Sequence, residues 1–322
     1  MRRATFAIAA LLALPLAGCP AEGGEDEPVD LTREFPELAG EGFALRTPEY
    51  VIPAGTEKQY CFITTYDGPD VGITATYNYQ TAMGHHVTIF GTNATERDFP
   101  DGMEWDCTET EALDMTAMEP IIIGGTIDYQ DDGVLNAFEL PEGMAAPLEN
   151  GTRIIVQSHY VNVRPEPVKV QDEAQILTVP EEDVEVWTAP LVATVTDFQI
   201  PANTDDHTLV FDCDYDESVS LLYIGGHLHE WGKSFKATHT RGGVSEVIYE
   251  VPEWDPVFRD APLYTPFEED EFTLEVGDTL TTECVWDNNT DDVLEFPAEM
   301  CVTFGMVYPA NVPVICSADI VE

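Results

Sequence analysis

The segment VSLLYIGGHLH at residues 219–229 contains the pattern that decides the fold of this 322-residue chain. Its first six residues form a short run typical of a β-strand, and the two glycines after them end the run. Comparable runs at residues 72–77 and 153–157 are bounded by Gly, Pro, Asn or Asp, and a helical period is absent. Together with 23 prolines and 23 glycines, this pattern predicts an all-β fold from residue 49 onward.

A faint internal repeat predicts two domains of the same type. Residues 50–57 (YVIPAGTE) resemble residues 198–205 (FQIPANTD), and each copy is followed by a cysteine and then by a histidine pair. Duplication of one sandwich explains this shared order, and the chain length also favours two domains. We predict two tandem antiparallel β-sandwiches, jelly-roll-like, at residues 40–180 and 181–322, with the boundary near the acidic turn at residues 180–183.

The N-terminus has the features of a processing signal. Two arginines precede an apolar run at residues 4–17 that is too short to span a bilayer comfortably, and the run ends in Leu-Ala-Gly-Cys, which looks like a bacterial lipoprotein cleavage box. An ordinary secreted protein with an incidental cysteine is the alternative. We predict a lipid-anchored protein of the bacterial cell envelope, on the periplasmic, outer-membrane or extracellular side. Its leading segments are a signal peptide at residues 1–18, lipidation at Cys19 and an acidic flexible tether at residues 19–39.

The charge of the chain is strongly negative, with 61 acidic against 13 basic residues and a net charge of -48. Such a surface repels nucleic acid and anionic membranes, so neither is an expected partner and membrane contact should occur only through the lipid anchor. The acids are scattered along the chain, which favours solvation in a salty habitat over cation binding. We make no prediction of oligomeric state.

The His-x-His motif at residues 227 and 229 predicts one metal site. Residues i and i+2 of a strand point to the same face, so both imidazoles can reach one ion. Gly225 and Gly226 give the backbone room to turn in front of them. If Met300 joins this pair, the set indicates copper, because a neutral thioether suits Cu(I) and is a poor ligand for zinc or magnesium.

The pair His85 and His86 predicts a second metal site in the first half of the chain. Neighbouring residues of a regular strand point to opposite faces, so both can bind one ion only if the backbone near Gly84 is bulged or lies at a strand end. His159 is the one remaining histidine of this half and is the candidate third ligand. Neither set contains a thiolate or a carboxylate, which favours copper over structural zinc. Surface solvation and a structural role are expected for His207 and His239, respectively.

Six cysteines besides Cys19 predict disulfides. An even number of cysteines in an exported chain favours three bridges, and the sequence alone does not choose among the possible pairings. The six are Cys61, Cys107, Cys213, Cys284, Cys301 and Cys316.

These motifs together resemble the copper type II, ascorbate-dependent monooxygenases, the group that includes peptidylglycine α-hydroxylating monooxygenase and dopamine β-monooxygenase. The likeness covers roughly residues 45–318, in order and at similar spacing, and the ligand motifs are specific only in combination. The matching segments are GHHVTIF at residues 84–90, QSHYVN at 157–162, GHLHEWG at 226–232, EVGDTL at 275–280 and AEMCV at 298–302.

The resemblance implies a role for each candidate ligand. It implies two copper ions, separated in the family by an open, solvent-filled gap. His85, His86 and His159 would hold the copper that transfers electrons, and His227, His229 and Met300 the copper that binds dioxygen and hydroxylates the substrate. The implied disulfides are Cys61–Cys107, Cys213–Cys316 and Cys284–Cys301.

The match weakens around the substrate. Peptide-amidating members hold the substrate carboxylate with an arginine at the position of Gly225, and their polar pair after the methionine ligand is replaced here by Val302 and Phe304. Peptidylglycine is therefore not the expected substrate. An apolar pocket formed by Val302, Phe304 and Met306 suggests an aromatic or aliphatic C–H substrate, and Gln157 matches a family glutamine near the active site.

The sequence thus predicts a copper-dependent monooxygenase that hydroxylates a C–H bond of a small organic substrate with O2. The electrons would come from ascorbate or another external one-electron reductant, which the sequence does not identify. Two alternatives remain: a non-catalytic copper-binding or copper-handling envelope lipoprotein, and a structural sandwich pair whose histidines bind nothing.

Overall fold

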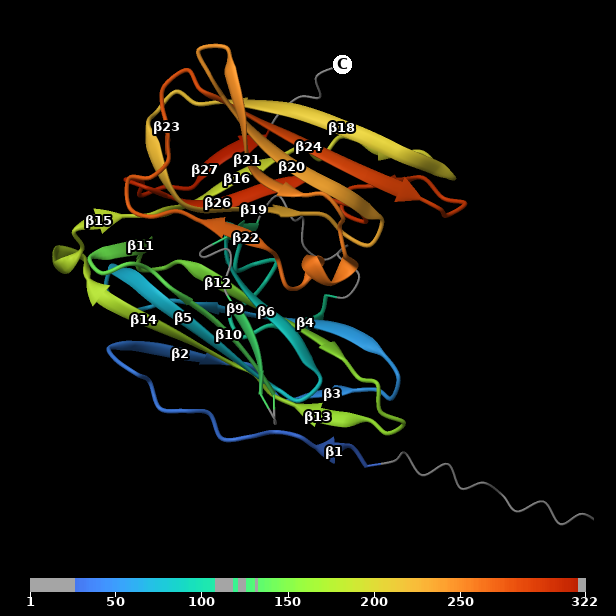
Figure 1. Cartoon of the computed structure of the whole chain (residues 1–322). Helices are drawn as coiled ribbons and strands as arrows, with labels where there is room; N and C mark the ends of the chain where they lie inside the picture. The colour runs from blue at the N-terminus through green and yellow to red at the C-terminus, as the bar shows by residue number, and fades with distance from the viewer. Residues whose placement is uncertain (1–26, 108–117, 121–125, 131–132, 318–322) are drawn as a thin grey trace, which may run out of the picture.

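The computed structural model describes residues 27–107, 118–120, 126–130 and 133–317 (Figure 1). The predicted signal peptide, Cys19 and the start of the predicted tether lie outside the described residues. The described chain is almost entirely strand, interrupted by the short 3-10 turns η3 (Glu181–Asp183) and η4 (Pro256–Arg259). The all-β prediction is confirmed. Within the described ranges, no helix is long and apolar enough to cross a membrane.

The N-terminal half contains two large sheets with an apolar core between them. The seven-stranded sheet has the order β15 (Val186–Trp187), β11 (Met144–Leu148), β5 (Val71–Thr81), β10 (Gly133–Glu139), β9 (Thr126–Gln130), with β14 (Glu173–Pro180) beside β5 and β2 (Gly42–Arg46) beside β14. The five-stranded sheet has the order β7 (Glu104–Asp106), β4 (Glu57–Thr65), β12 (Arg153–Val161), β6 (Gly84–Thr92), β8 (Met118–Pro120). A smaller sheet contains β1 (Val29–Asp30), β13 (Val168–Val170) and β3 (Tyr50–Ile52).

The C-terminal half repeats this two-sheet arrangement around the buried side chains of Phe211, Phe235 and Trp286. One sheet has the order β22 (Tyr264–Pro266), β19 (Val219–His227), β26 (Val302–Tyr308), β16 (Ala189–Thr194), β27 (Val314–Ser317), with β23 (Thr273–Leu274) also beside β19. The other has the order β18 (Thr204–Asp214), β24 (Thr279–Asn288), β20 (Gly232–Arg241), β21 (Val244–Val251), and β17 (Gln199–Ile200) pairs with β25 (Leu294–Glu295).

Two segments at the edges of the predicted domains belong to the first half. β15 follows the predicted boundary but still pairs with β11, and β16 is the first strand of the second half. The predicted tether is not wholly flexible, since β1 pairs with β13 in parallel. Val29 and Leu31 pack against an apolar cluster around Tyr50, so this part of the tether has enough apolar surface to dock.

The repeat seen in the sequence reappears as the same hydrogen-bond network in both halves. In the first, the Asn162 side chain donates to the backbone oxygens of Ile52 and Pro53 at 3.1 and 3.0 Å. In the second, the Asn288 side chain donates to those of Ile200 and Pro201 at 3.2 and 3.0 Å. Asn162 directly follows the central strand β12 and Asn288 is the last residue of the central strand β24, so the Ile-Pro turn is tied to the corresponding place in each half. This correspondence supports duplication of one sandwich.

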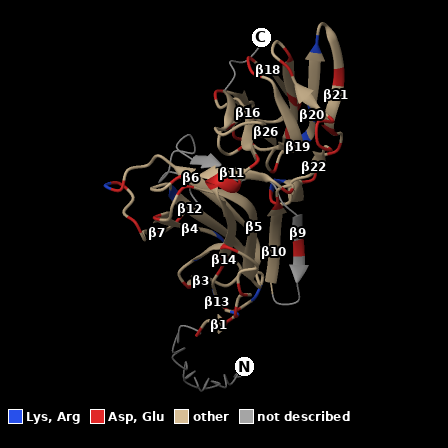
Figure 2. Cartoon of the chain, turned by 90° about the vertical axis from the view of Figure 1, so that its left-hand side faces the viewer, with Lys and Arg blue, Asp and Glu red and all other residues tan. Residues whose placement is uncertain are grey.

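Apolar side chains from both halves share one core at the junction between them, and Figure 2 shows the strands of the two halves stacked one above the other. Tyr223, Phe304 and Met306 of the second half are buried against strands of the first, and the rings of Tyr223 and Phe138 lie 5.6 Å apart. Each fully buried side chain of this size contributes about 1.5–3 kcal/mol. The two halves are therefore held face to face.

A buried carboxyl group lies close to the central strand β12. Asp172 is fully buried and accepts a hydrogen bond from the Gln80 amide at 2.9 Å, and the same amide donates to the backbone oxygen of His159 at 3.3 Å. Burial raises the pKa of Asp172 to about 6, because a carboxylate loses its hydration there. The folded protein thus holds a proton that the unfolded chain releases at a lower pH.

Asp172→Asn should raise the free energy of unfolding near neutral pH by on the order of 2 kcal/mol and change it little at about pH 4. The folded wild-type carboxyl keeps its proton up to about pH 6, while the unfolded one loses it near pH 4, so its contribution to stability falls as the pH rises through that window. Urea unfolding followed by circular dichroism at both pH values measures the difference. A change of equal size at both would contradict the assigned cause.

Candidate metal centre

The first histidine cluster lies where β6 and β12 run side by side. His86 is opposite His159 in the ladder, but Tyr160 is opposite Gly84, so His85 is an extra residue at a bulge. This irregularity is the one that the paired histidines required. A side chain at position 84 would come within 2.4 Å of the Gln80 Cβ atom, which explains the glycine there. The bulge turns both neighbouring imidazoles toward β12.

The Nδ1 atoms of the three histidines face one another. Those of His86 and His159 are 3.4 Å apart, and the rings of His85 and His159 have centroids 5.1 Å apart. On the other side of its ring, His159 Nε2–H donates to the Glu57 carboxylate at 2.8 Å, which fixes the tautomer that leaves the Nδ1 lone pair free. The buried Nδ1 of His85 has no hydrogen-bond partner. The structure thus brings His85, His86 and His159 together.

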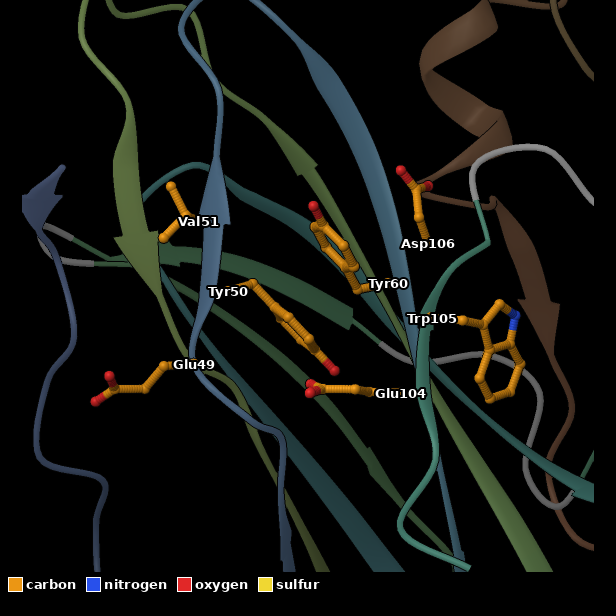
Figure 3. A pocket seen from close by; sticks show the side chains of 7 residues that line it. All are labelled: Glu49, Tyr50, Val51, Tyr60, Glu104, Trp105 and Asp106. Carbon is orange, nitrogen blue, oxygen red and sulfur yellow. The ribbon is translucent and has the colours of Figure 1, made fainter. Parts of the chain in front are cut away.

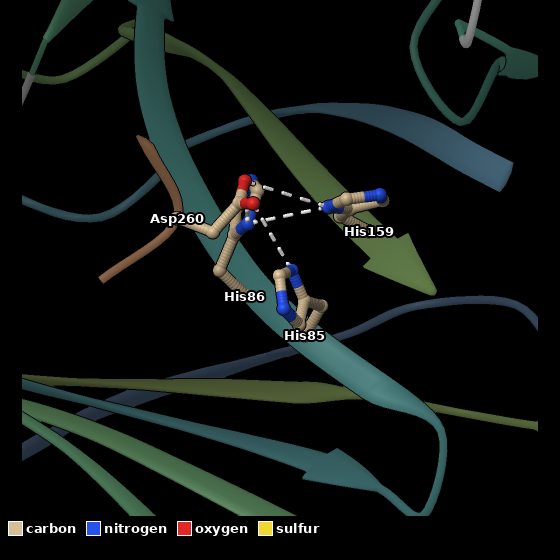
Figure 4. Close-up of side chains that lie close together, drawn as sticks. All are labelled: His85, His86, His159 and Asp260. Carbon is tan, nitrogen blue, oxygen red and sulfur yellow. Dashed lines mark hydrogen bonds and ion pairs between the residues drawn. The ribbon is translucent and has the colours of Figure 1, made fainter. Parts of the chain in front are cut away.

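A carboxylate from the other half of the chain completes this cluster (Figure 4). Asp260 lies directly after η4. One of its carboxylate oxygens is 3.3 Å from His85 Nδ1. The other is 3.2 Å from His86 Nδ1 and 3.7 Å from His159 Nδ1. The group of potential ligand atoms here thus includes a carboxylate, which the sequence did not predict. Nothing in the local sequence around Asp260 reveals this role, because it depends on how the two halves dock.

The surroundings of the cluster favour neutral imidazoles at His85 and His86 and a charged carboxylate at Asp260. Burial is the main cause that lowers the pKa values of His85 and His86. Burial alone would raise the pKa of Asp260, but hydrogen bonds with His159, His86 and Arg259 outweigh it and hold that pKa well below its ordinary range. Neutral imidazoles and an ionised carboxylate are the forms that bind metal ions.

The second histidine pair lies at the end of β19. The Nε2 atoms of His227 and His229 are 3.0 Å apart, and His229 Nδ1–H donates to the backbone oxygen of Ala298 at 3.1 Å, so its Nε2 lone pair faces His227. Burial lowers the pKa of His227 to about 3 and that of His229 to about 4. Both are neutral near pH 7 and suited to share one ion.

Glu299 anchors the loop that carries this pair. Its fully buried carboxylate accepts the backbone N–H groups of His229 and Trp231 at 3.0 and 2.8 Å, and the Trp286 indole N–H at 2.9 Å. The backbone N–H of Met300 lies 3.3 Å from the same oxygen that holds His229. Met300 is half-buried directly beside this anchor. The disulfide Cys284–Cys301 fixes the following residue to β24.

The cysteines pair as the resemblance implies. The bridges are Cys61–Cys107, Cys213–Cys316 and Cys284–Cys301. The Gln157 amide lies 3.9 Å from both sulfurs of the first bridge, so this side chain contacts the disulfide. Of the other histidines, His239 donates to Asp278 at 2.8 Å in a buried network, as its structural role requires, and His207 is partly exposed near Trp286.

The predicted apolar substrate pocket is filled by protein. Phe304 and Met306 are buried in the core at the junction, and Val302, opposite His227 in the ladder, packs against that core. A side chain at position 225 would come within 2.4 Å of the Phe304 ring. The Phe304 ring therefore occupies the space beside Gly225, where the resemblance places an arginine. This differs from the expected open pocket.

A separate surface cavity of about 320 Å³ lies beside β3, β4 and β7 (Figure 3). It contains none of the predicted site residues. Its lining combines carboxylates with aromatic rings: Glu49, Tyr50, Val51, Tyr60, Glu104, Trp105 and Asp106.

Comparison with known protein families assigns the second half. Residues 188–321 match the model of the copper type II ascorbate-dependent monooxygenase, C-terminal domain. This part of the chain is therefore similar to the C-terminal domain of that family. The match contains His227, His229, Met300 and Asp260, while the first histidine cluster lies before it. The family is copper- and ascorbate-dependent in general, and the neutral nitrogen donors found here fit copper.

Two viral proteins are among the solved structures that resemble the chain. One is described as the triple jelly roll fold and turret assembly in an archaeal virus, with 11% identity over 86% of this chain and 62% of the other, and a TM-score of 0.22. The other is the infectious bursal disease virus VP2 subviral particle, with 10% identity over 87% and 74% and a TM-score of 0.22. The chain spans less than two thirds of the first protein's length. Superpositions this loose carry no information on function.

Glu299→Gln should weaken copper binding at the His227–His229 pair about 10–100-fold and lower stability by about 1–3 kcal/mol. The substituted amide turns N–H donors toward backbone and indole N–H groups that now lose their acceptor. Chelator-competition titrations and urea unfolding measure the two effects. The matched control is Glu295→Gln, an exposed carboxylate four residues earlier; equal behaviour of both variants would exclude the anchoring role.

Proposed function

We propose that this protein is a two-copper monooxygenase that inserts one oxygen atom of O2 into a C–H bond of a small organic substrate. Substrate, O2, two electrons and two protons give the alcohol and water, and ascorbate or another external one-electron reductant supplies the electrons. The observation that carries the proposal is the convergence of the His227 and His229 Nε2 atoms, 3.0 Å apart, within the family-matched domain. Copper bound there would supply the chemistry of dioxygen activation.

The surrounding residues support a division of roles. Glu299 holds the backbone of His229 and Met300, so the candidate ligands are positioned before any ion binds. The thioether of Met300 would favour Cu(I), the state that reacts with dioxygen. The histidines of the first cluster offer neutral nitrogens to an ion that only passes electrons onward.

The setting of the enzyme is also a proposal. From the N-terminal residues and the net charge of -48, we infer a lipid anchor at Cys19 in a bacterial cell envelope and no nucleic-acid partner. Partners would be the small substrate and O2.

One observation favours a second candidate, a copper-binding or copper-handling protein without turnover. Phe304 and Met306 are buried at the junction, with exposed fractions of 3% and 0%. A protein that only stores or passes on copper needs the ligands but no substrate pocket. Oxygen uptake with ascorbate and a substrate library separates the two functions: an 18O-labelled product from 18O2 requires the monooxygenase, and uptake at the background rate supports copper handling.

Met300→Leu should lower the rate of hydroxylation roughly 100-fold or more, while copper stays at the first histidine cluster. The leucine keeps the volume of the side chain but removes the sulfur donor. Product formation and the copper content of each site, resolved by electron paramagnetic resonance, are the measurements. Undiminished turnover would remove Met300 from the oxygen-reacting site.

A further inference from the structure

We propose that Asp260 is a fourth ligand of the metal at the first histidine cluster, so that metal binding there links the two halves of the chain. The inference rests on the copper assignment above. Three ligands would come from strands of the N-terminal half and the fourth from the C-terminal half (Figure 4).

The geometry is that of a closed four-donor site. One potential ligand atom from each of His85, His86, His159 and Asp260 lies within 4.8 Å of the others. The carboxylate faces the Nδ1 atoms of all three rings, which are the potential ligand atoms, and not the Nε2 side of His159 that Glu57 occupies. His85 Nδ1 is buried and lacks a hydrogen-bond partner, which an ion at the centre would satisfy.

The carboxylate is itself held in place. The Arg259 guanidinium donates to both oxygens of Asp260, at 2.9–3.2 Å, and lies 3.7 Å from both Glu57 and Glu230. Carboxylate ligands are commonly fixed by such outer hydrogen bonds. Arg259 therefore orients Asp260 across the junction.

The segment that carries Asp260 is also bonded to the second histidine pair. Trp254 donates its indole N–H to the backbone oxygen of His229 at 3.1 Å, and its ring packs on Phe258 of η4 at 5.6 Å. The Asp255 side chain caps η4 through the N–H of Val257 at 3.0 Å. Residues 254–260 thus form a short, braced connection between the two metal-binding clusters.

A carboxylate distinguishes between the oxidation states of copper. Hard oxygen donors favour Cu(II), whereas Cu(I) prefers softer ligands, so Asp260 would tighten the site for Cu(II) and add little for Cu(I). One-electron reduction of the bound ion by ascorbate would then weaken the interaction between Asp260 and the ion, and with it the link between the two halves. Four protein ligands suit an ion that exchanges electrons and needs no open position.

The test is Asp260→Asn, in full-length protein that also carries His227→Ala and His229→Ala so that only the first cluster binds copper. We expect Cu(II) affinity, measured by chelator competition, to fall ~10-fold or more and Cu(I) affinity to change less than ~3-fold. Each tenfold selective loss of Cu(II) affinity raises the reduction potential by about 59 mV. Glu230→Gln, which removes a carboxylate near Arg259 but outside the cluster, should change neither affinity.

Hydrogen exchange supplies a readout that a merely structural Asp260 would not move. Cu(II) should slow amide exchange in residues 254–261 of the parent protein, because Asp260 ties this segment to an ion held by the other half, and should not do so in Asp260→Asn. Equal Cu(II) affinity and equal protection in both proteins would overturn the role of Asp260 as a ligand that links the halves, while leaving the copper site intact. Failure of the parent itself to bind copper would overturn the proposed function as well.

Discussion

The apolar junction between the two halves is the constraint on which both histidine clusters depend. Tyr223 and Phe304 pack against the N-terminal sheets, and this packing brings η4 to the ends of β6 and β12. The same burial removes the imidazoles from water, which costs the charged form more than the neutral form. Packing therefore does two things at once: it assembles ligands that are distant in the sequence, and it keeps their lone pairs free for a metal ion.

The two halves share a frame but have different ligand sets. The networks of Asn162 and Asn288 show that β12 corresponds to β24, so the neighbouring strands β6 and β20 also correspond. Each histidine pair lies at or just before the start of one of these two strands. The third candidate ligands do not correspond: His159 is on β12, whereas Met300 follows β25 in a loop. Duplication thus accounts for the paired imidazoles, and later divergence accounts for the difference in donor chemistry.

The sequence predicted those features that follow from local pattern and failed where docking decides. Strand periodicity gave the all-β fold, and the adjacent pair His85 and His86 required the bulge that the β6 ladder contains. Asp260 was missed because no spacing rule links a residue after η4 to histidines of the other half. The burial of Phe304 was also missed. An apolar residue near a ligand fits a pocket wall and a core equally well, and only the close approach to Gly225 tells them apart.

A packed junction also changes what a substrate can be. The pKa of His227 is lowered mainly by burial and by His229, and it also responds to Asp260 and, across the junction, to His86. The Phe304 ring occupies the place of a carboxylate-binding arginine. Arg259, the cation at this junction, already faces three carboxylates. Under the proposed function, the absence of an unpaired cation among these described groups and the net charge of -48 would favour an uncharged or cationic substrate over an anionic one.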